Sequence, residues 1–215
     1  LQSMLMGQDL TLTPYEFVSR ANATVHAELG TFSVQEDRAN GKEETIQLSF
    51  VRFKCTQPNP GSPIVYLAGG PGGSGTGTAK GRRLELLMKL REVADVIAFD
   101  QRGTGMSQEL PRCLYSISFE LGKAIDKSEY IQRTSENIEK CRAFWEEKGV
   151  NLQAYNTTES AQDIDDLRKV LQAEKISLWG ISYGSHLAFE YIRLFEDHVD
   201  RVVLASLEGS DETIK

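Results

Sequence analysis

Cysteine, histidine, long apolar runs and clusters of basic residues are all scarce in this chain of 215 residues. Its three cysteines include no Cys-x-x-Cys pair, so a structural zinc site is not expected. No apolar stretch approaches the roughly 18–20 residues of a membrane-spanning helix. The net charge is −7 and no run of Lys and Arg is present, so nucleic acid is not expected as a main partner.

The cysteines leave two interpretations open. Cys55, Cys113 and Cys141 are either three buried free thiols, or Cys113 pairs with Cys141, which would indicate an oxidising compartment.

Residues 1–6 do not combine a basic region with a following apolar run, so no signal peptide is expected within this sequence.

Two kinds of apolar pattern predict the fold. Val25–Val34 and Thr45–Lys54 have the alternating pattern of strands, and residues 37–42 between them have the composition of a turn. Later apolar runs are continuous, as in strands buried on both faces of a parallel sheet; they lie at residues 64–68, 95–99, 176–179 and 201–205. Helical patterns separate or follow these runs, at residues 84–88, 127–148, 156–171 and 187–195.

Strands that alternate with helices indicate an α/β fold with a mostly parallel sheet, preceded here by an antiparallel hairpin. The polar and mixed residues 1–24 are expected to form an N-terminal arm or a short helix. Residues 25–215 are expected to form one core domain, in which residues 108–125 are irregular, because no repeat or low-complexity segment divides them.

A Gly-x-Ser-x-Gly motif lies between the apolar run ending near Trp179 and the helical pattern that follows it. Its residues are Gly180-Ile181-Ser182-Tyr183-Gly184. This strand–turn–helix context is typical of a nucleophile elbow, in which a sharp turn projects the serine hydroxyl from the sheet. Glycine is needed at Gly180 and Gly184 because a side chain there would clash with the neighbouring strand or helix.

A second glycine-rich stretch, residues 69–75, follows an apolar run and contains Gly70-x-Gly72-x-x-Gly75. This matches the dinucleotide-binding pattern, and Asp95 or Asp100 would be the ribose ligand in that interpretation. Pro71 argues against it, because proline removes a backbone donor near the pyrophosphate, and the helix is expected to start only several residues after Gly75. We therefore favour an oxyanion-hole loop, in which a backbone N–H stabilises a developing negative charge.

Three stretches together resemble a known family. They are Gly69-Gly70-Pro71-Gly72-Gly73-Ser74-Gly75, Asp100-Gln101-Arg102-Gly103-Thr104-Gly105-Met106-Ser107 and Gly180-Ile181-Ser182-Tyr183-Gly184. In this order they resemble the α/β-hydrolase fold, and more narrowly the proline iminopeptidase family with its secreted, tripeptidyl-aminopeptidase-like relatives. The resemblance covers residues 28–207 and only the N-terminal part of such an enzyme. Ala68 departs from the iminopeptidases, which usually carry histidine there, and moves the match toward the secreted relatives.

The resemblance assigns roles to several residues. Ser182 would be the nucleophile, and the backbone N–H groups of Tyr183 and Gly70 would form the oxyanion hole. Asp100 and Arg102 would be structural residues beside the site; within the loop itself they could also simply form a salt bridge. The secreted relatives carry a cysteine pair like Cys113 and Cys141, which implies a disulfide and an extracytoplasmic location.

The activity implied is that of a serine aminopeptidase that acts on peptides through an acyl-enzyme, without a metal or an organic cofactor. An acidic group in a cap outside this sequence would bind the free N-terminus of the substrate. An esterase or lactonase that acts on a small acyl substrate is the alternative on the same fold. A nucleotide-binding oxidoreductase and a non-catalytic binding fragment are the two remaining alternatives.

The acid and base of a catalytic triad are not expected within this sequence. The three histidines are His26, His186 and His198, and none follows the nucleophile at the position that this fold uses for its base. Asp211 follows the last predicted strand directly, too early for the triad acid. We therefore expect the N-terminal half of a hydrolase, inactive alone and completed by a C-terminal half or a second chain. Its last strand would leave an unpaired apolar edge.

Overall fold

The computed structural model describes residues 10–40, 43–120 and 122–209. The chain divides into two compact units, Leu1–Glu109 with Tyr155–Lys215, and Leu110–Ala154. The expectation of one undivided core domain over residues 25–215 did not anticipate this second unit.

Among the described residues, the first unit contains the whole sheet and four of the α-helices. Its strands are β1 (Thr11–Val18), β2 (Thr24–Gln35), β3 (Thr45–Phe53), β4 (Gly61–Leu67), β5 (Ala94–Asp100), β6 (Ile176–Ile181) and β7 (Val199–Ala205). Its helices are α1 (Gly75–Ala79), α2 (Arg83–Leu90), α4 (Thr157–Val170), α5 (Tyr183–Phe195) and the short 3₁₀ helix η2 (Glu196–His198).

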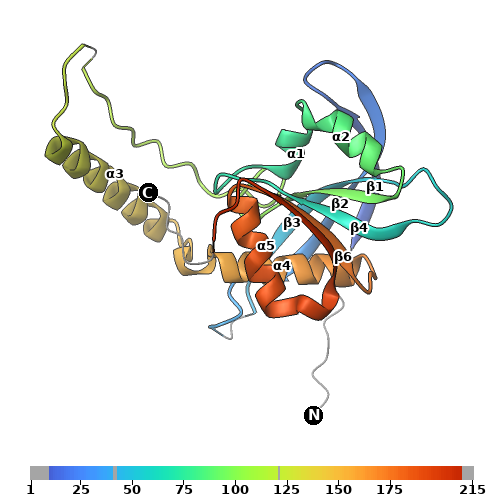
Figure 1. Cartoon of the computed structure of the whole chain (residues 1–215). Coiled ribbons are helices and arrows are strands. Elements are labelled where there is room, and N and C mark those ends of the chain that lie inside the picture. Colours follow the sequence, from blue (N-terminus) through green and yellow to red (C-terminus); the bar gives the residue numbers. More distant parts are fainter. Residues whose placement is uncertain (1–9, 41–42, 121, 210–215) are drawn as a thin grey trace. The chain divides into compact units, whose positions relative to one another are not determined.

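The sheet is mixed and its strand order is β1-β2-β3-β5-β4-β6-β7. Strands β1, β2 and β3 form an antiparallel meander that joins β5, whereas β5, β4, β6 and β7 run parallel to one another. Helices α1 and α2 cover one face, and α4 and α5 cover the other (Figure 1). This is the predicted α/β architecture with its leading hairpin.

The prediction of an N-terminal arm or short helix over residues 1–24 is wrong for Thr11–Val18. These residues form β1, which pairs with β2, and Phe17 is fully buried with its ring centroid 5.0 Å from that of Phe53. Pro14 hid the strand in the sequence, because proline cannot donate to a neighbouring strand. At the edge of a sheet that donor is not needed, so Pro14 is tolerated there. Residues 1–9 lie outside the described residues.

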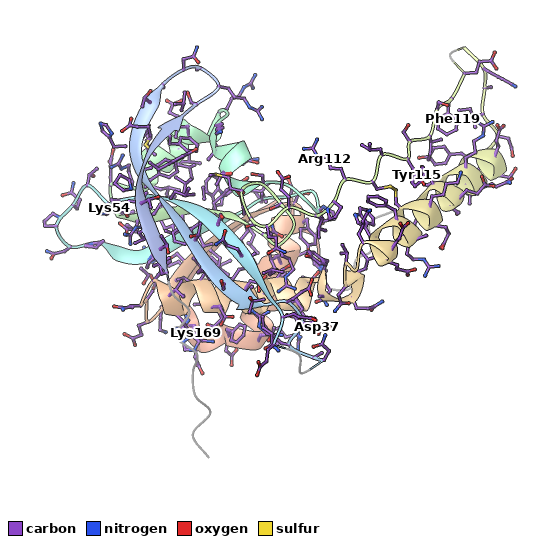
Figure 2. All side chains as sticks on the ribbon, turned by 180° about the vertical axis from the view of Figure 1, so that it is seen from behind. Asp37, Lys54, Arg112, Tyr115, Phe119 and Lys169 are labelled. Atoms are coloured by element: carbon purple, nitrogen blue, oxygen red, sulfur yellow. A yellow bond between two sulfur atoms is a disulfide. The ribbon has the colours of Figure 1, made fainter. Side chains whose placement is uncertain are left out.

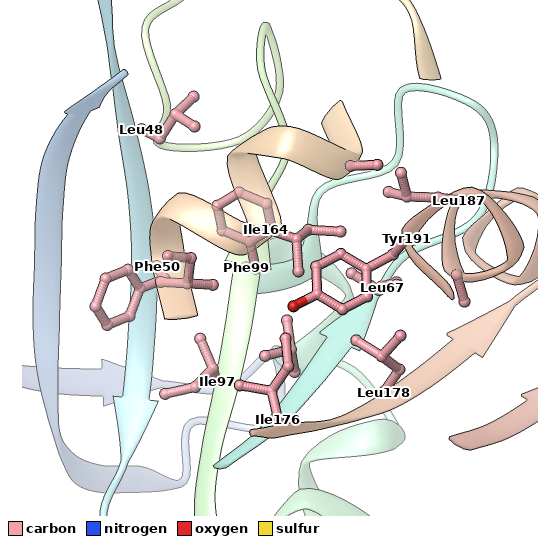
Figure 3. Close-up of a cluster of buried hydrophobic side chains, with 14 of the residues drawn as sticks. Leu48, Phe50, Leu67, Ile97, Phe99, Ile164, Ile176, Leu178, Leu187 and Tyr191 are labelled. Atoms are coloured by element: carbon pink, nitrogen blue, oxygen red, sulfur yellow. The ribbon is translucent and has the colours of Figure 1, made fainter. Parts of the chain in front are cut away.

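The larger apolar core lies between the sheet and helices α4 and α5. Figure 3 shows Ile164 of α4 and Tyr191 of α5 against the strand residues Leu67, Ile97 and Leu178, all almost completely buried. The predicted helical faces of α4 and α5 are therefore the faces that pack on the sheet. Continuous apolar runs in β4, β5 and β6 follow from burial on both faces.

Strand β7 is the last strand of the sheet in the described part of the chain, as expected from the sequence. Val203 is 63% exposed. An apolar groove of about 520 Å³ lies beside it, lined by residues that include Leu86 and Leu90 of α2 and Trp179 of β6.

The second unit consists of an extended segment, helix α3 (Lys127–Glu147) and the 3₁₀ helix η1 (Leu152–Ala154). Cys113 and Cys141 form a disulfide with their Cα atoms 5.5 Å apart, and Cys55 in the first unit is a free thiol. Figure 2 shows Phe119 on the extended segment beside α3; its ring stacks on that of Tyr130 at 5.8 Å.

Acid should weaken the first unit through Asp165 of α4, whose carboxylate accepts from Arg168 Nε at 2.7 Å and Lys169 Nζ at 2.8 Å. Burial opposes its charge, but these two cations outweigh burial and hold the pKa of Asp165 below its usual value. The carboxylate therefore contributes stability above the unfolded pKa near 4, and the contribution is lost as the pH falls through the lower folded pKa. Urea unfolding at pH 6, 4 and 3 should show a shallower pH dependence for Asp165→Asn than for the wild type.

The control for this experiment is Asp197→Asn, because Asp197 is an exposed residue of η2. We expect the control to keep the wild-type dependence on pH. Parallel curves for Asp165→Asn and the wild type would show that Asp165 titrates alike in the folded and unfolded chain.

Candidate active site

The site is built around the sharp turn between β6 and α5. Only Ser182 separates the last residue of the strand from the first residue of the helix, and its backbone has φ 56° and ψ −128°. The turn is held on both sides: Ser182 N donates to the carbonyl oxygen of Ala205 at 2.9 Å, and Ser185 N donates to that of Ser182 at 2.7 Å. A positive φ at a non-glycine residue costs about 1–3 kcal/mol and is concentrated at functional sites.

The two glycines of the motif are required by close backbone contacts. A Cβ added to Gly180 would lie 2.4 Å from the carbonyl oxygen of Gly184, and a Cβ added to Gly184 would lie 2.1 Å from that of Leu67. Neither neighbour is a flexible side chain, so the backbone itself would have to move. The clash that the sequence predicted at these positions is therefore present.

Gly184→Ala should destabilise the protein by about 1–3 kcal/mol, because the new methyl group would push α5 away from the end of β4. The matched control is Gly81→Ala, where the added Cβ would lie 3.4 Å from its nearest neighbour, an ordinary contact. Thermal and urea unfolding of both variants would measure the difference. Equal stability of the two variants would contradict the packing described for Gly184.

The glycine-rich loop after β4 lies directly against Ser182. A Cβ added to Gly69 would be 3.0 Å from Ser182 Cβ and 3.4 Å from Ser182 Oγ. Gly73 N donates to the carbonyl oxygen of Gly69 at 3.0 Å, and Gly70 has φ 136°, so the loop doubles back tightly at this point. The structure thus brings Gly70 and Tyr183 to the same place as Ser182. Their role as oxyanion-hole donors stays a prediction.

The expectation that a helix starts only several residues after Gly75 is wrong. Helix α1 begins at Gly75, because Ser74 caps it: Ser74 Oγ accepts from Gly77 N at 2.8 Å. This removes one of the two arguments against a dinucleotide. However, Thr76 N in the first turn donates to Asp100 Oδ1 at 2.9 Å, so a carboxylate of the chain itself already satisfies this helix N-terminus.

Asp100 is fully buried and joins two loops beside the site. Besides the bond from Thr76 N, its carboxylate accepts from Ser74 Oγ at 2.8 Å, from Thr76 Oγ1 at 2.6 Å and from Met106 N at 2.8 Å. Gly105, at φ 56°, leaves room for this carboxylate, since a Cβ there would lie 2.2 Å from it. Asp100 therefore organises the site without contacting Ser182.

The salt bridge between Asp100 and Arg102 that the loop sequence allowed is not formed. The Arg102 guanidinium faces α4 instead, where its Nε and Nη2 donate to the two carboxylate oxygens of Asp163, both at 2.8 Å. Asp100 is already saturated by uncharged donors. Arg102 therefore ties its loop to α4, in keeping with a structural role.

Arg102 belongs to a larger buried network of charges. Arg38, in the turn between β2 and β3, donates to Asp163 at 2.9 Å, to Asp166 at 2.8 Å and to Glu159. Burial opposes the charge of Arg38, but the carboxylates of Asp163 and Asp166 outweigh it and raise its pKa above the usual value. Asp37 and Lys169 mark the hairpin turn and α4 in Figure 2. Two segments more than 120 residues apart are joined here.

Glu208 is the residue of the site that the sequence did not predict. Ser182 Oγ donates to Glu208 Oε1 at 2.7 Å, three residues after the end of β7. A signal for it exists, because the carboxyl ends of parallel strands gather at one edge of a sheet and carry its ligand-binding residues. Both Ser182 and Glu208 follow such strands.

None of the three histidines is hydrogen-bonded to Ser182. His26 on β2 pairs with Glu16 on β1, and His198 lies in η2. His186 Nδ1 is 2.9 Å from the carbonyl oxygen of Gly209, and its ring stacks on Tyr183 with centroids 5.7 Å apart. Asp211, which the sequence analysis set aside as the acid, lies outside the described residues.

The described residues hold no helix long and apolar enough to cross a membrane. Within residues 10–40, 43–120 and 122–209, no group of three or more His, Cys, Asp or Glu side chains is arranged to hold a metal ion.

The fold and the turn at Ser182 define the class of protein. Residues 62–214 match the family described as the alpha/beta hydrolase fold, and the chain belongs to this family. A solved protein from Agrobacterium vitis S4 has the same fold, with a TM-score of 0.51 and 15% identity over 83% of this chain and 51% of that one. At this identity the likeness concerns the fold alone.

Two curated relatives are named as peptidases. The chain is 28% identical over 174 residues to a tripeptidyl aminopeptidase of Streptomyces lividans, covering 78% of this chain and 32% of that protein. It is 29% identical over 177 residues to the serine protease Hip1 of Mycobacterium tuberculosis, a match that covers 80% of this chain and 34% of that protein. The chain thus spans about a third of the length of these relatives.

Proposed function

We propose that the protein is a serine hydrolase of the aminopeptidase type, which acts through an acyl-enzyme on Ser182. The observation that carries the proposal is the position of Ser182 on a positive-φ turn between β6 and α5, with the Gly69–Gly75 loop against it. The names of the two curated relatives, a tripeptidyl aminopeptidase and a serine protease, favour peptides over other acyl substrates.

The chemistry follows from this geometry. Ser182 Oγ attacks the carbonyl carbon of the substrate while a base removes its proton, and the negative charge that develops on the carbonyl oxygen is stabilised by the N–H groups of Tyr183 and Gly70. The base then protonates the leaving amine, and the acyl group stays on Ser182. Water, deprotonated by the same base, releases the N-terminal product and restores the hydroxyl.

The base and its orienting carboxylate are proposed to come from outside this sequence. His26 pairs with Glu16, His186 is hydrogen-bonded to Gly209, and His198 lies in η2. The hydroxyl of Ser182 donates to Glu208 and to none of these histidines. The matched region is only about a third of the length of each relative, so the remainder of such a protein offers room for a histidine and an acid. The 215 residues alone are accordingly proposed to be inactive.

The test is labelling of the full-length protein with a fluorophosphonate probe. Labelling on the Ser182 peptide, lost in Ser182→Ala, would support a serine hydrolase. Aminoacyl- and peptidyl-coumarins compared with short-chain nitrophenyl esters would separate the peptidase from an esterase or lactonase. No labelling, combined with enhanced NADH fluorescence on mixing, would refute the proposal in favour of a nucleotide-binding protein.

An extracytoplasmic location is proposed for the same protein. The disulfide between Cys113 and Cys141 supports it, because disulfides persist in oxidising compartments. Non-reducing mass spectrometry of the protein purified from its native source tests this directly. Free thiols at both positions would contradict it.

A further inference from the structure

The hydroxyl of the proposed nucleophile donates a hydrogen bond to a carboxylate. Ser182 Oγ donates to Glu208 Oε1, and the backbone of Glu208 is fixed independently of this bond. Its N–H donates to Ser185 Oγ at 2.9 Å, and Ser185 Oγ donates in turn to the carbonyl oxygen of Ser182 at 2.7 Å. Glu208 is therefore held by the same helical turn that holds Ser182.

Glu208 has no cationic partner among the residues that the structure describes, although its side chain is half-buried. Two other half-buried carboxylates of the first unit do have one. Glu190, on the helix that follows Ser182, pairs with Arg193 at 2.7 Å, and Glu28 pairs with Arg52 and Lys54. A partly desolvated carboxylate beside the nucleophile favours binding of a cation that arrives with the substrate.

We propose that Glu208 binds the α-ammonium group of the residue whose carbonyl carbon Ser182 attacks. This rests on the proposed function and adds the group that recognises the substrate. Once Ser182 Oγ is bonded to the carbonyl carbon of the substrate, the ammonium nitrogen is three bonds from Oγ. This places it about 3–4 Å from that oxygen. A carboxylate oxygen 2.7 Å from Oγ can therefore come within hydrogen-bond distance of such a nitrogen when both lie on the same side of Oγ. When the substrate binds, Glu208 accepts a hydrogen bond from the ammonium instead of from Ser182 Oγ. The serine hydroxyl can then donate to the base.

This position of the carboxylate also selects the length of the product. Each further residue between the amine and the attacked carbonyl adds about 3.4 Å of extended chain. The ammonium of a tripeptide product would therefore lie about 7 Å further away, out of reach of Glu208. Glu208 thus favours release of single residues, a specificity different from that named in the tripeptidyl aminopeptidase relative.

The experiment compares Glu208→Gln with the wild type in the full-length protein. Glutamine keeps the size and the acceptor oxygen but removes the charge. We expect the KM for alanyl-coumarin to rise roughly ten- to hundredfold, the usual effect of losing one charge-assisted hydrogen bond. Hydrolysis of nitrophenyl acetate and fluorophosphonate labelling involve no ammonium and report the effect of the lost Ser182–Glu208 bond on the nucleophile itself; the loss on alanyl-coumarin should exceed the loss on these two by at least about tenfold. Glu208→Asp should recover part of the KM, and the exposed Glu196→Gln serves as the control.

Each outcome decides the question. An equal loss on alanyl-coumarin, nitrophenyl acetate and the probe would overturn the inference and make Glu208 a residue that only positions Ser182. An unchanged KM for alanyl-coumarin, or a wild-type preference for N-acetylalanyl- or trialanyl-coumarin, would overturn it as well. If the wild type is labelled at Ser182, an equal loss, an unchanged KM or a preference for trialanyl-coumarin would leave the proposed function standing. A preference for N-acetylalanyl-coumarin would leave the serine hydrolase standing but not the aminopeptidase. Absence of labelling in the wild type would refute the two together.

Discussion

Ser182→Ala should reduce kcat/KM of the full-length protein by about 10⁴- to 10⁶-fold on every substrate that the wild type cleaves. The reason is chemical: without Oγ no acyl-enzyme forms, and only binding and the oxyanion-hole donors remain. The free energy of unfolding should change by no more than about 1 kcal/mol. Alanine has to adopt the same backbone conformation as serine at this position, and the substitution removes only one hydrogen bond, the one to Glu208. Steady-state kinetics with urea unfolding of the same preparation measure both quantities.

The control for this variant is Ser177→Ala on β6, five residues before the turn. It removes a hydroxyl from the same strand and should keep activity near the wild-type value. If Ser182→Ala retained more than a few per cent of the activity, Ser182 would not be the nucleophile, and the proposed mechanism would fail with it.

Asp163→Ala should destabilise the protein by about 3–5 kcal/mol. The Asp163 side chain is completely buried and accepts from both Arg102 and Arg38, whose side chains are themselves largely buried. Removing it leaves two guanidinium groups desolvated, although Glu159 and Asp166 still pair with them. The cost is therefore dominated by the charges left behind, and it exceeds what a single hydrogen bond contributes.

Asp166→Ala provides the comparison for Asp163→Ala. Asp166 also pairs with Arg38, but it is partly exposed and water can replace it, so a loss of about 1 kcal/mol is expected. Urea unfolding of the two variants gives the difference directly. A loss below about 1 kcal/mol for Asp163→Ala would show that the network contributes little to the folded state.

The local signals in the sequence predicted most of the fold. Periodicity in residues 24–35 and 45–53 gave the hairpin, and the spacing of apolar residues gave α3 almost to its ends. The motif at residues 180–184 gave the strand–turn–helix around Ser182, because two glycines and a serine at fixed spacing are needed within a few residues of chain. Such features depend on neighbours in sequence and can be inferred from them.

The errors share a different origin. Thr11–Val18 became a strand through pairing with β2, although Pro14 argues against a strand locally. Helix α1 starts at Gly75 because Ser74 caps it, and the Ser74 hydroxyl is itself held by Asp100, at the end of another strand. Arg102 turned away from Asp100 because Asp163 offers a buried carboxylate 61 residues further along. In each case a distant partner decided the outcome.

The sequence by itself determined the class of fold, the position of Ser182 and the glycines around it, because hydrophobic periodicity and backbone sterics act over short distances. Only the tertiary structure decided which charges are paired and which group contacts the serine. Glu208 reaches Ser182 across 26 residues because β6 and β7 lie parallel and end at the same edge of the sheet. Contacts of this kind are made by folding, and no pattern along the chain specifies their partners.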